Sequence, residues 1–169
     1  MEKMKANKYE KIVKTEIKNS KLVQEKRLQI AKAATKLFVR KVYSQTSMRE
    51  ISRASGLTIG NLYDYITRKE DVLFLVFDVF YSMLVNSLEE LKLFEIEDPI
   101  RQLELALQTI IEVGHSYRDM VLLMYTESKL LPRDLLKIIL ENESKFIKRF
   151  EDILRKGVEK GVFKIDDPF

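Results

Sequence analysis

Apolar residues recur at three- and four-residue spacing along almost the whole chain, and this spacing limits the possible folds more than any other feature. Side chains spaced in this way share one face of an α-helix, so the pattern predicts a series of amphipathic helices. Only 5 Gly and 3 Pro interrupt 169 residues, few for a fold with many tight turns, and 46% of the residues are hydrophobic. We therefore expect an all-α protein of roughly one to one and a half domains with a sizeable core.

The composition argues against several classes of protein. The absence of Cys rules out disulfides, thiolate metal sites and cysteine nucleophiles in this sequence. A single His, no metal-spaced cluster and no glycine-rich phosphate loop are poor material for catalysis, so we expect no enzyme, no cofactor and no metal site. The charged N-terminus does not resemble a signal peptide, and no uncharged apolar run approaches the ~20 residues that span a bilayer. We expect a soluble cytoplasmic protein with no membrane partner.

The net charge of +4 is distributed unevenly along the chain. Residues 1–69 hold 17 Lys and Arg against 6 Asp and Glu, whereas residues 70–169 hold 13 against 20. A basic first part joined to an acidic remainder indicates a polyanionic partner for the first part only. A solvated helix with a basic tail would give the same charges. Residues 1–20 are either a basic arm or an extension of the helix that follows.

Two short helices joined by a tight turn are predicted after a first helix over residues 21–41. Ser47 and Glu50 form a capping box, in which the Ser side chain accepts from the Glu amide and the Glu side chain reaches back. Gly56 supplies the left-handed residue that ends this helix, and Thr58 caps a second helix over residues 59–66. This is the helix-turn-helix arrangement, whose second helix lies in the major groove of DNA.

The second helix of this motif has side chains suited to contact with DNA. Thr58, Asn61 and Tyr63 lie on or near its leading end, and Asn can pair with adenine while Thr offers a hydroxyl and a methyl group. Gly60 removes a side chain where the backbone would approach the groove. Residues 67–70 read as a second capping box, whose free amides and Lys69 would form a phosphate seat.

The run from Arg27 to Leu73 resembles the DNA-binding domain of the TetR/AcrR family of transcriptional regulators. The shared pattern consists of Ala33-Ala34, Leu37-Phe38, Tyr43, Thr46, Arg49-Glu50-Ile51, Ala54, Gly56-Leu57, Gly60, Leu62-Tyr63, Tyr65, Lys69-Glu70 and Leu73. The resemblance implies that Thr46 or Ser47 binds phosphate, that Thr58, Ile59 and Asn61 face base edges, and that Tyr63 and Lys69 clamp phosphates. The hydroxyl groups of Thr46, Ser47 and Thr58 also fit a role as helix caps alone. The sequence departs from the family pattern at Val42, where Gly is usual.

The resemblance divides the chain into a basic N-terminal arm at residues 1–20, a helix-turn-helix domain at residues 21–67 and a helical ligand-binding and dimerisation domain at residues 68–169. In the second domain the apolar spacing predicts helices over residues 68–93, 99–114, 116–131 and 133–160. The family's last two helices, which build the dimer, would follow residue 169. We therefore expect that this dimer interface is missing or shortened, or that dimerisation uses the helices present.

The resemblance further implies an effector pocket within this helical bundle and a homodimer that reads double-stranded DNA. Met and aromatic side chains at helical spacing are more often core than pocket, but they are the candidates for its lining: Tyr81, His115, Tyr117, Met120, Met124 and Tyr125. A weak likeness to fatty-acid-responsive members suggests an apolar or acyl effector. The function predicted is a ligand-released repressor that binds a palindromic operator through residues 58–66. The alternative is a helical interaction module of the same fold that no longer binds DNA.

Overall fold

The computed structural model describes residue 13 and residues 15–165, and within them every regular element is helical. The α-helices are α1 (Ser20–Lys41), α2 (Met48–Ser55), α3 (Ile59–Tyr63), α4 (Lys69–Glu90), α5 (Pro99–Ser116), α6 (Arg118–Glu127) and α7 (Arg133–Glu159). Short 3₁₀ turns, η2 (Tyr43–Gln45), η3 (Leu93–Glu95) and η4 (Ser128–Leu130), join some of them. The all-α expectation is confirmed.

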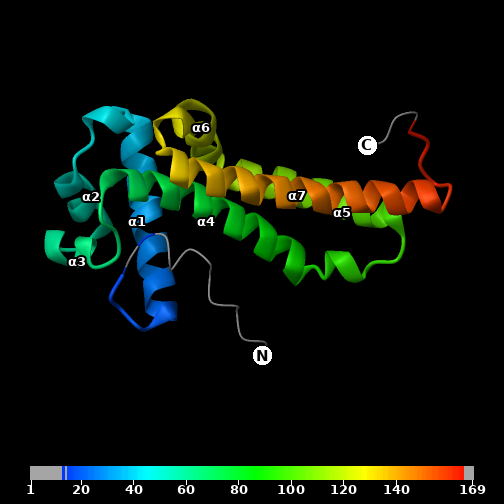
Figure 1. Cartoon of the computed structure of the whole chain (residues 1–169), viewed down its shortest axis with the longest axis horizontal. Helices are drawn as coiled ribbons and strands as arrows, with labels where there is room; N and C mark the ends of the chain where they lie inside the picture. The colour runs from blue at the N-terminus through cyan, green and yellow to red at the C-terminus, as the bar shows by residue number, and fades with distance from the viewer. Residues whose placement is uncertain (1–12, 14, 166–169) are drawn as a thin grey trace.

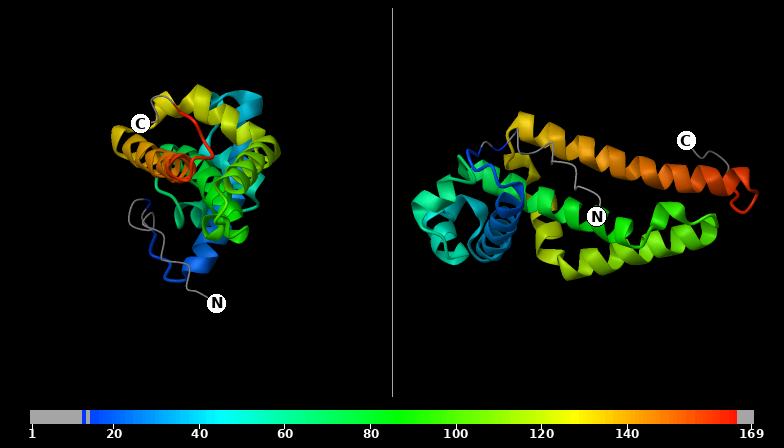
Figure 2. Two further views of the ribbon diagram at one scale, coloured as in Figure 1. Left: turned by 90° about the vertical axis from the view of Figure 1, so that its right-hand side faces the viewer. Right: turned by 90° about the horizontal axis from the view of Figure 1, so that it is seen from below.

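The molecule is elongated (Figure 1). Helices α1, α2 and α3 gather at one end, while α5 and α7 run side by side towards the other (Figures 1 and 2). Helix α4 follows α3 in the chain, packs along α1 and extends into the bundle, where it packs against α5, α6 and α7. Any shift of α4 along or across its axis therefore reaches both parts of the molecule.

Helix α4 is the core helix of the fold because its sequence is apolar on almost every side. Residues 71–78 are all buried, and they include the large side chains Leu73, Phe74 and Phe77. Its length and composition alone would also allow it to cross a membrane, but 61% of that apolar window is buried inside the structure. Burial against other helices accounts for an all-round apolar sequence in a core helix.

One continuous hydrophobic cluster runs through both predicted domains. It joins α1 (Ile30, Ala34) to α4 and continues to the first half of α7 (Leu135, Ile139). A second, smaller cluster of Leu88, Leu93, Ala106 and Ile153 lies at the distal end of the bundle. The division at residues 67 and 68 falls in the turn before α4, and it remains a prediction because α1 packs along α4 across it.

Several of the expected helix boundaries are corrected by the structure, among them the end of α5, which lies at Ser116 rather than residue 114. Helix α3 ends at Tyr63 rather than residue 66, and α4 ends at Glu90 rather than residue 93. The box at residues 67–70 is shifted, because the carboxylate of Asp71 accepts from the amides of both Thr67 and Arg68 at 2.9 Å. The predicted helix over residues 116–131 becomes α6 followed by η4. The first and last helices begin and end within a residue of their expected limits.

Candidate nucleic-acid interface

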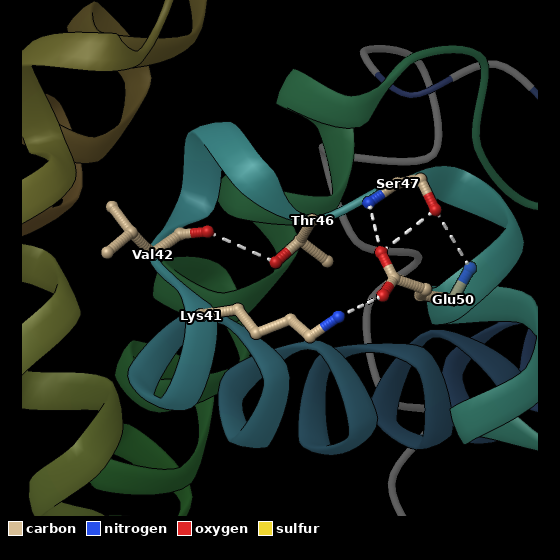
Figure 3. A network of polar contacts seen from close by, with 5 residues as sticks. All are labelled: Lys41, Val42, Thr46, Ser47 and Glu50. Atoms are coloured by element: carbon tan, nitrogen blue, oxygen red, sulfur yellow. Dashed lines mark hydrogen bonds and ion pairs between the residues drawn. The ribbon is translucent and has the colours of Figure 1, made fainter.

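The start of α2 is fixed by a compact polar network (Figure 3). Ser47 and Glu50 form the predicted capping box: the Ser47 amide donates to the Glu50 carboxylate at 2.9 Å, and the Glu50 amide donates to the Ser47 hydroxyl at 3.3 Å. Lys41, at the end of α1, pairs with the same carboxylate at 2.5 Å. The hydrogen bond from Lys41, followed by those from Ser47, lowers the pKa of Glu50 to about 2. This network ties the end of α1 to the first turn of α2.

The two hydroxyls proposed for phosphate binding have different environments. Ser47 is exposed, whereas Thr46 is 2% exposed and its hydroxyl donates to the Val42 carbonyl at 3.1 Å (Figure 3). Thr46 therefore closes the turn between α1 and α2. Ser47 is the hydroxyl of this pair that an incoming phosphate could reach.

The turn between α2 and α3 has the predicted geometry. Gly56 lies at φ 69°, in the left-handed region that favours glycine, and it ends α2. The Ser52 hydroxyl donates to the Leu57 carbonyl at 2.6 Å, and Gln29 on α1 donates to the Ser55 carbonyl at 2.5 Å. These contacts hold α3 at a fixed angle to α2.

Helix α3 and its cap present all three predicted base-reading residues to solvent. Thr58 caps it, with its hydroxyl accepting from the Asn61 amide at 3.2 Å. Asn61 is exposed, as are Ile59 and Tyr63, at 40% and 50%, while Leu62 is fully buried and anchors the helix in the core. A Cβ atom added at Gly60 would meet nothing within 4 Å, so this outer face is open. The arrangement is a short exposed helix held by a buried leucine and a capped turn.

Lys69 lies apart from this exposed face. Its ammonium donates to the carbonyls of Tyr43 and Ser44 and lies 4.2 Å from the centroid of the Tyr43 ring. Partial burial lowers the pKa of Lys69, and burial, followed by the charge of Glu70, raises the pKa of Tyr43. Lys69 thus holds η2 against the start of α4 rather than extending into solvent.

Sequence reasoning missed two exposed arginines at the same helix starts. Arg49 is in the first turn of α2, and Arg68 precedes α4 with its side chain 47% exposed while pairing with Asp71 and Asp134. The capping patterns that marked these helix starts were the available signal, because a cation at the N-terminal end of a helix suits phosphate. Each arginine is a candidate phosphate contact beside Ser47.

The six predicted pocket residues differ in their burial. Met120 is part of the core, Tyr81, Tyr117 and Met124 pack against it, and His115 and Tyr125 are exposed. Burial, and then the charges of Glu143 and Tyr125, raise the pKa of Tyr81 to about 12. An open groove of about 560 Å³ lies along α7 and one of about 440 Å³ lies between α1 and α2, and neither is lined by any of the six.

A helix-turn-helix joined by one long helix to a helical bundle is the architecture of a DNA-binding regulator. Comparisons with known proteins specify the family. A model described as "Bacterial regulatory proteins, tetR family" matches residues 30–76, and one described as "Tetracyclin repressor-like, C-terminal domain" matches residues 97–169. The chain belongs to the TetR family of transcriptional regulators.

Individual relatives agree with this assignment. The HTH-type transcriptional regulator HbdR of Aromatoleum sp. (strain CIB) is 31% identical over 156 residues, and the match covers 90% of this chain and 66% of HbdR. The TetR family regulator PfmR from Thermus thermophilus has a similar structure, with a TM-score of 0.73, 27% identity, and coverage of 82% and 75% of the two chains. AibR, in complex with isovaleryl coenzyme A and operator DNA, shares the fold with a TM-score of 0.70, 22% identity, and coverage of 85% and 77%.

Proposed function

We propose that this chain is a DNA-binding transcriptional regulator in which α3 reads the bases of an operator. The observation that carries the proposal is the exposed face of α3, where Thr58, Ile59, Asn61 and Tyr63 lie outward on a helix held by buried Leu62 and two capped turns. Helix-turn-helix proteins insert the leading residues of such a helix into the major groove. Asn61 would pair with a base edge, and Tyr63 would contact phosphate or sugar.

The phosphate contacts would come from the starts of the neighbouring helices. Ser47, Arg49 and Arg68 are exposed at the starts of α2 and α4, and the N-terminal end of a helix favours negative charge. Lys69 would act indirectly, by holding η2 in place. The excess of basic residues over residues 1–69 would steer the duplex to this end of the molecule.

The regulator would act as a cytoplasmic homodimer that represses transcription from a palindromic operator and releases it when an effector binds. A two-fold operator requires two copies of α3 at a fixed spacing of about one helical turn of DNA. Isovaleryl coenzyme A is bound in the AibR structure, and we infer an apolar acyl effector for this chain from that likeness. Effector binding would shift α4, which joins the helical bundle to the helix-turn-helix. This shift would lower the affinity for DNA.

The test is binding of the full chain to the DNA upstream of its own gene, measured by fluorescence anisotropy over a salt series. We expect tight binding that weakens steeply with salt, because phosphate contacts release counterions. Asn61→Ala should lower affinity for the specific fragment by roughly 1–3 kcal/mol and leave affinity for random DNA nearly unchanged. Asn86→Ala, the same change at an exposed position on α4, is the matched control.

Other outcomes would count against the proposal. Equal affinity for the upstream fragment and for random DNA would remove the sequence-reading role of α3. Absence of binding at low salt would favour the alternative of a helical interaction module that has kept the fold without the DNA-binding activity.

A further inference from the structure

The groove of about 440 Å³ between α1 and α2, called here the α1–α2 groove, combines a cationic rim with a floor of small and apolar side chains. Its lining consists of Gln29, Lys32, Ala33, Lys36, Leu37, Arg40, Ala54 and Ser55. None of these residues belongs to α3, and those from α2 lie at the end of that helix opposite to Ser47. The groove is therefore a separate surface from the exposed face of α3.

Three exposed cations form the rim of the groove. Lys32, Lys36 and Arg40 follow one another at four-residue spacing on α1, so they share one face of the helix at intervals of about 6 Å. Within the part of the chain that the structure describes, none of the three has a hydrogen bond or an ion pair. The lining holds no acid, and Glu50 on α2 is already paired with Lys41. The uncompensated positive charge of the rim favours an anionic occupant.

The floor of the groove suits a partner whose backbone approaches closely. Ala33 on α1 and Ala54 on α2 have short side chains, and the distance at which helices pack depends on the side chains at the contact. Leu37 is partly buried against the core and offers an apolar contact. The Gln29 side-chain amide donates to the Ser55 carbonyl at 2.5 Å and so fastens α1 to α2 beside the groove. The groove is preformed, which lowers the cost of filling it.

We propose that the α1–α2 groove is a docking site for an acidic amphipathic helix of a partner protein. Carboxylates at positions i, i+4 and i+8 of such a helix repeat at the same interval as the three cations, so each carboxylate can face one cation. An apolar side chain beside them would contact Leu37, as in other helix-in-groove complexes. A DNA backbone would engage the cations but leave the concave apolar floor unfilled. The docking site goes beyond the proposed function and does not depend on it.

The experiment uses a synthetic peptide as the probe. It is an Ala-rich helix of about 18 residues, long enough to be helical alone, with Glu at three successive i, i+4 positions and Leu beside the central Glu. Its binding to the full chain without DNA is measured by fluorescence anisotropy. We expect saturable binding that weakens as salt rises, and about tenfold weaker binding of the same peptide with Gln in place of Glu.

Two variants separate the charge of the rim from the shape of the groove. Lys36→Glu reverses the central cation and should weaken peptide binding about tenfold, whereas Lys148→Glu, the same reversal at an exposed position on α7, should leave it nearly unchanged. Ala54→Trp keeps all three cations but fills the groove, and it should weaken binding by a similar factor. Because Ala54 is exposed, this variant should fold. A peptide whose central Glu is replaced by Lys should bind Lys36→Glu more tightly than it binds the wild type.

Several outcomes would overturn the proposal. No peptide binding to the wild type would remove the site, and undiminished binding to Ala54→Trp would mean that charge alone attracts the peptide. A lower DNA affinity and a smaller salt dependence in Lys36→Glu, with peptide binding unchanged, would assign the cations to phosphates instead. Self-association of the wild type that is lost in Lys36→Glu would make a second copy the occupant. A chain that binds the peptide but no DNA would retain the docking site and lose the proposed function, so the two failures are distinguishable.

Discussion

Val42 adopts a backbone conformation that β-branched residues rarely tolerate. Its φ of 66° lies in the region that favours glycine, and its side chain is exposed, so no buried packing offsets the strain. The conformation is held by the bonds around it: the Val42 amide donates to Phe38, and the Val42 carbonyl accepts from Thr46. This strain lies at the position where the family usually has Gly.

Val42→Gly should therefore stabilise the protein. Strained backbone costs of order 1–3 kcal/mol, and the greater freedom of glycine in the unfolded chain removes part of the gain, which leaves about 1 kcal/mol. Thermal unfolding should show an increase in Tm of about 2–4 °C. Val39→Gly makes the same chemical change inside α1 and should destabilise the protein instead. A fall in Tm for both variants would mean that Val42 is not strained.

At the scale of elements, α2 is a short helix whose start depends on its cap. Ser47→Ala removes the hydroxyl that accepts from the Glu50 amide, and such losses cost about 0.5–2 kcal/mol. We expect a lower midpoint in urea unfolding with an unchanged slope. Ser144→Ala, an exposed serine in the middle of α7, removes a similar hydroxyl that caps nothing and should be neutral or slightly stabilising. Equal losses in the two variants would contradict the capping role.

The sequence predicts elements well where the signal is local. The cap at Ser47 and the left-handed Gly56 follow from residue chemistry within one turn, and the structure confirms both. Local patterns were less informative at the start of α4, where both Glu70 and Asp71 are acids in the first turn. The N-cap is Arg68 rather than Thr67, so Asp71 is the acid that completes the capping box. The internal role of Lys69 also depends on η2, which lies far earlier in the chain, and no periodicity predicts that contact.

At the scale of the whole molecule, the fold follows from apolar periodicity, but the coupling between its parts does not. Helical spacing identifies α1 and α4 as amphipathic or buried helices without specifying which of their side chains meet. The pocket residues illustrate the same limit, because Met and Tyr at helical spacing suit a core as well as a cavity, and Met120 joins the core. Long-range pairing of side chains is set by how the helices pack, which no local pattern encodes.

The two hydrophobic clusters predict how cooperatively the molecule unfolds. The larger cluster joins α1 to α4 and the first half of α7. The helix-turn-helix and the part of the bundle next to it should therefore unfold together. The distal cluster around Leu88, Leu93, Ala106 and Ile153 is small and should open separately at lower free energy. Leu73→Ala in the large cluster should cost about 2–5 kcal/mol and lower exchange protection from α1 to α7. Leu93→Ala is the matched change in the distal cluster, and it should raise exchange around residues 88–106 and 150–158 while the amides of α1 and α2 keep their protection. Loss of protection throughout the chain in Leu93→Ala would mean instead that the described helices form one cooperative unit, through which any disturbance of the distal bundle reaches α3.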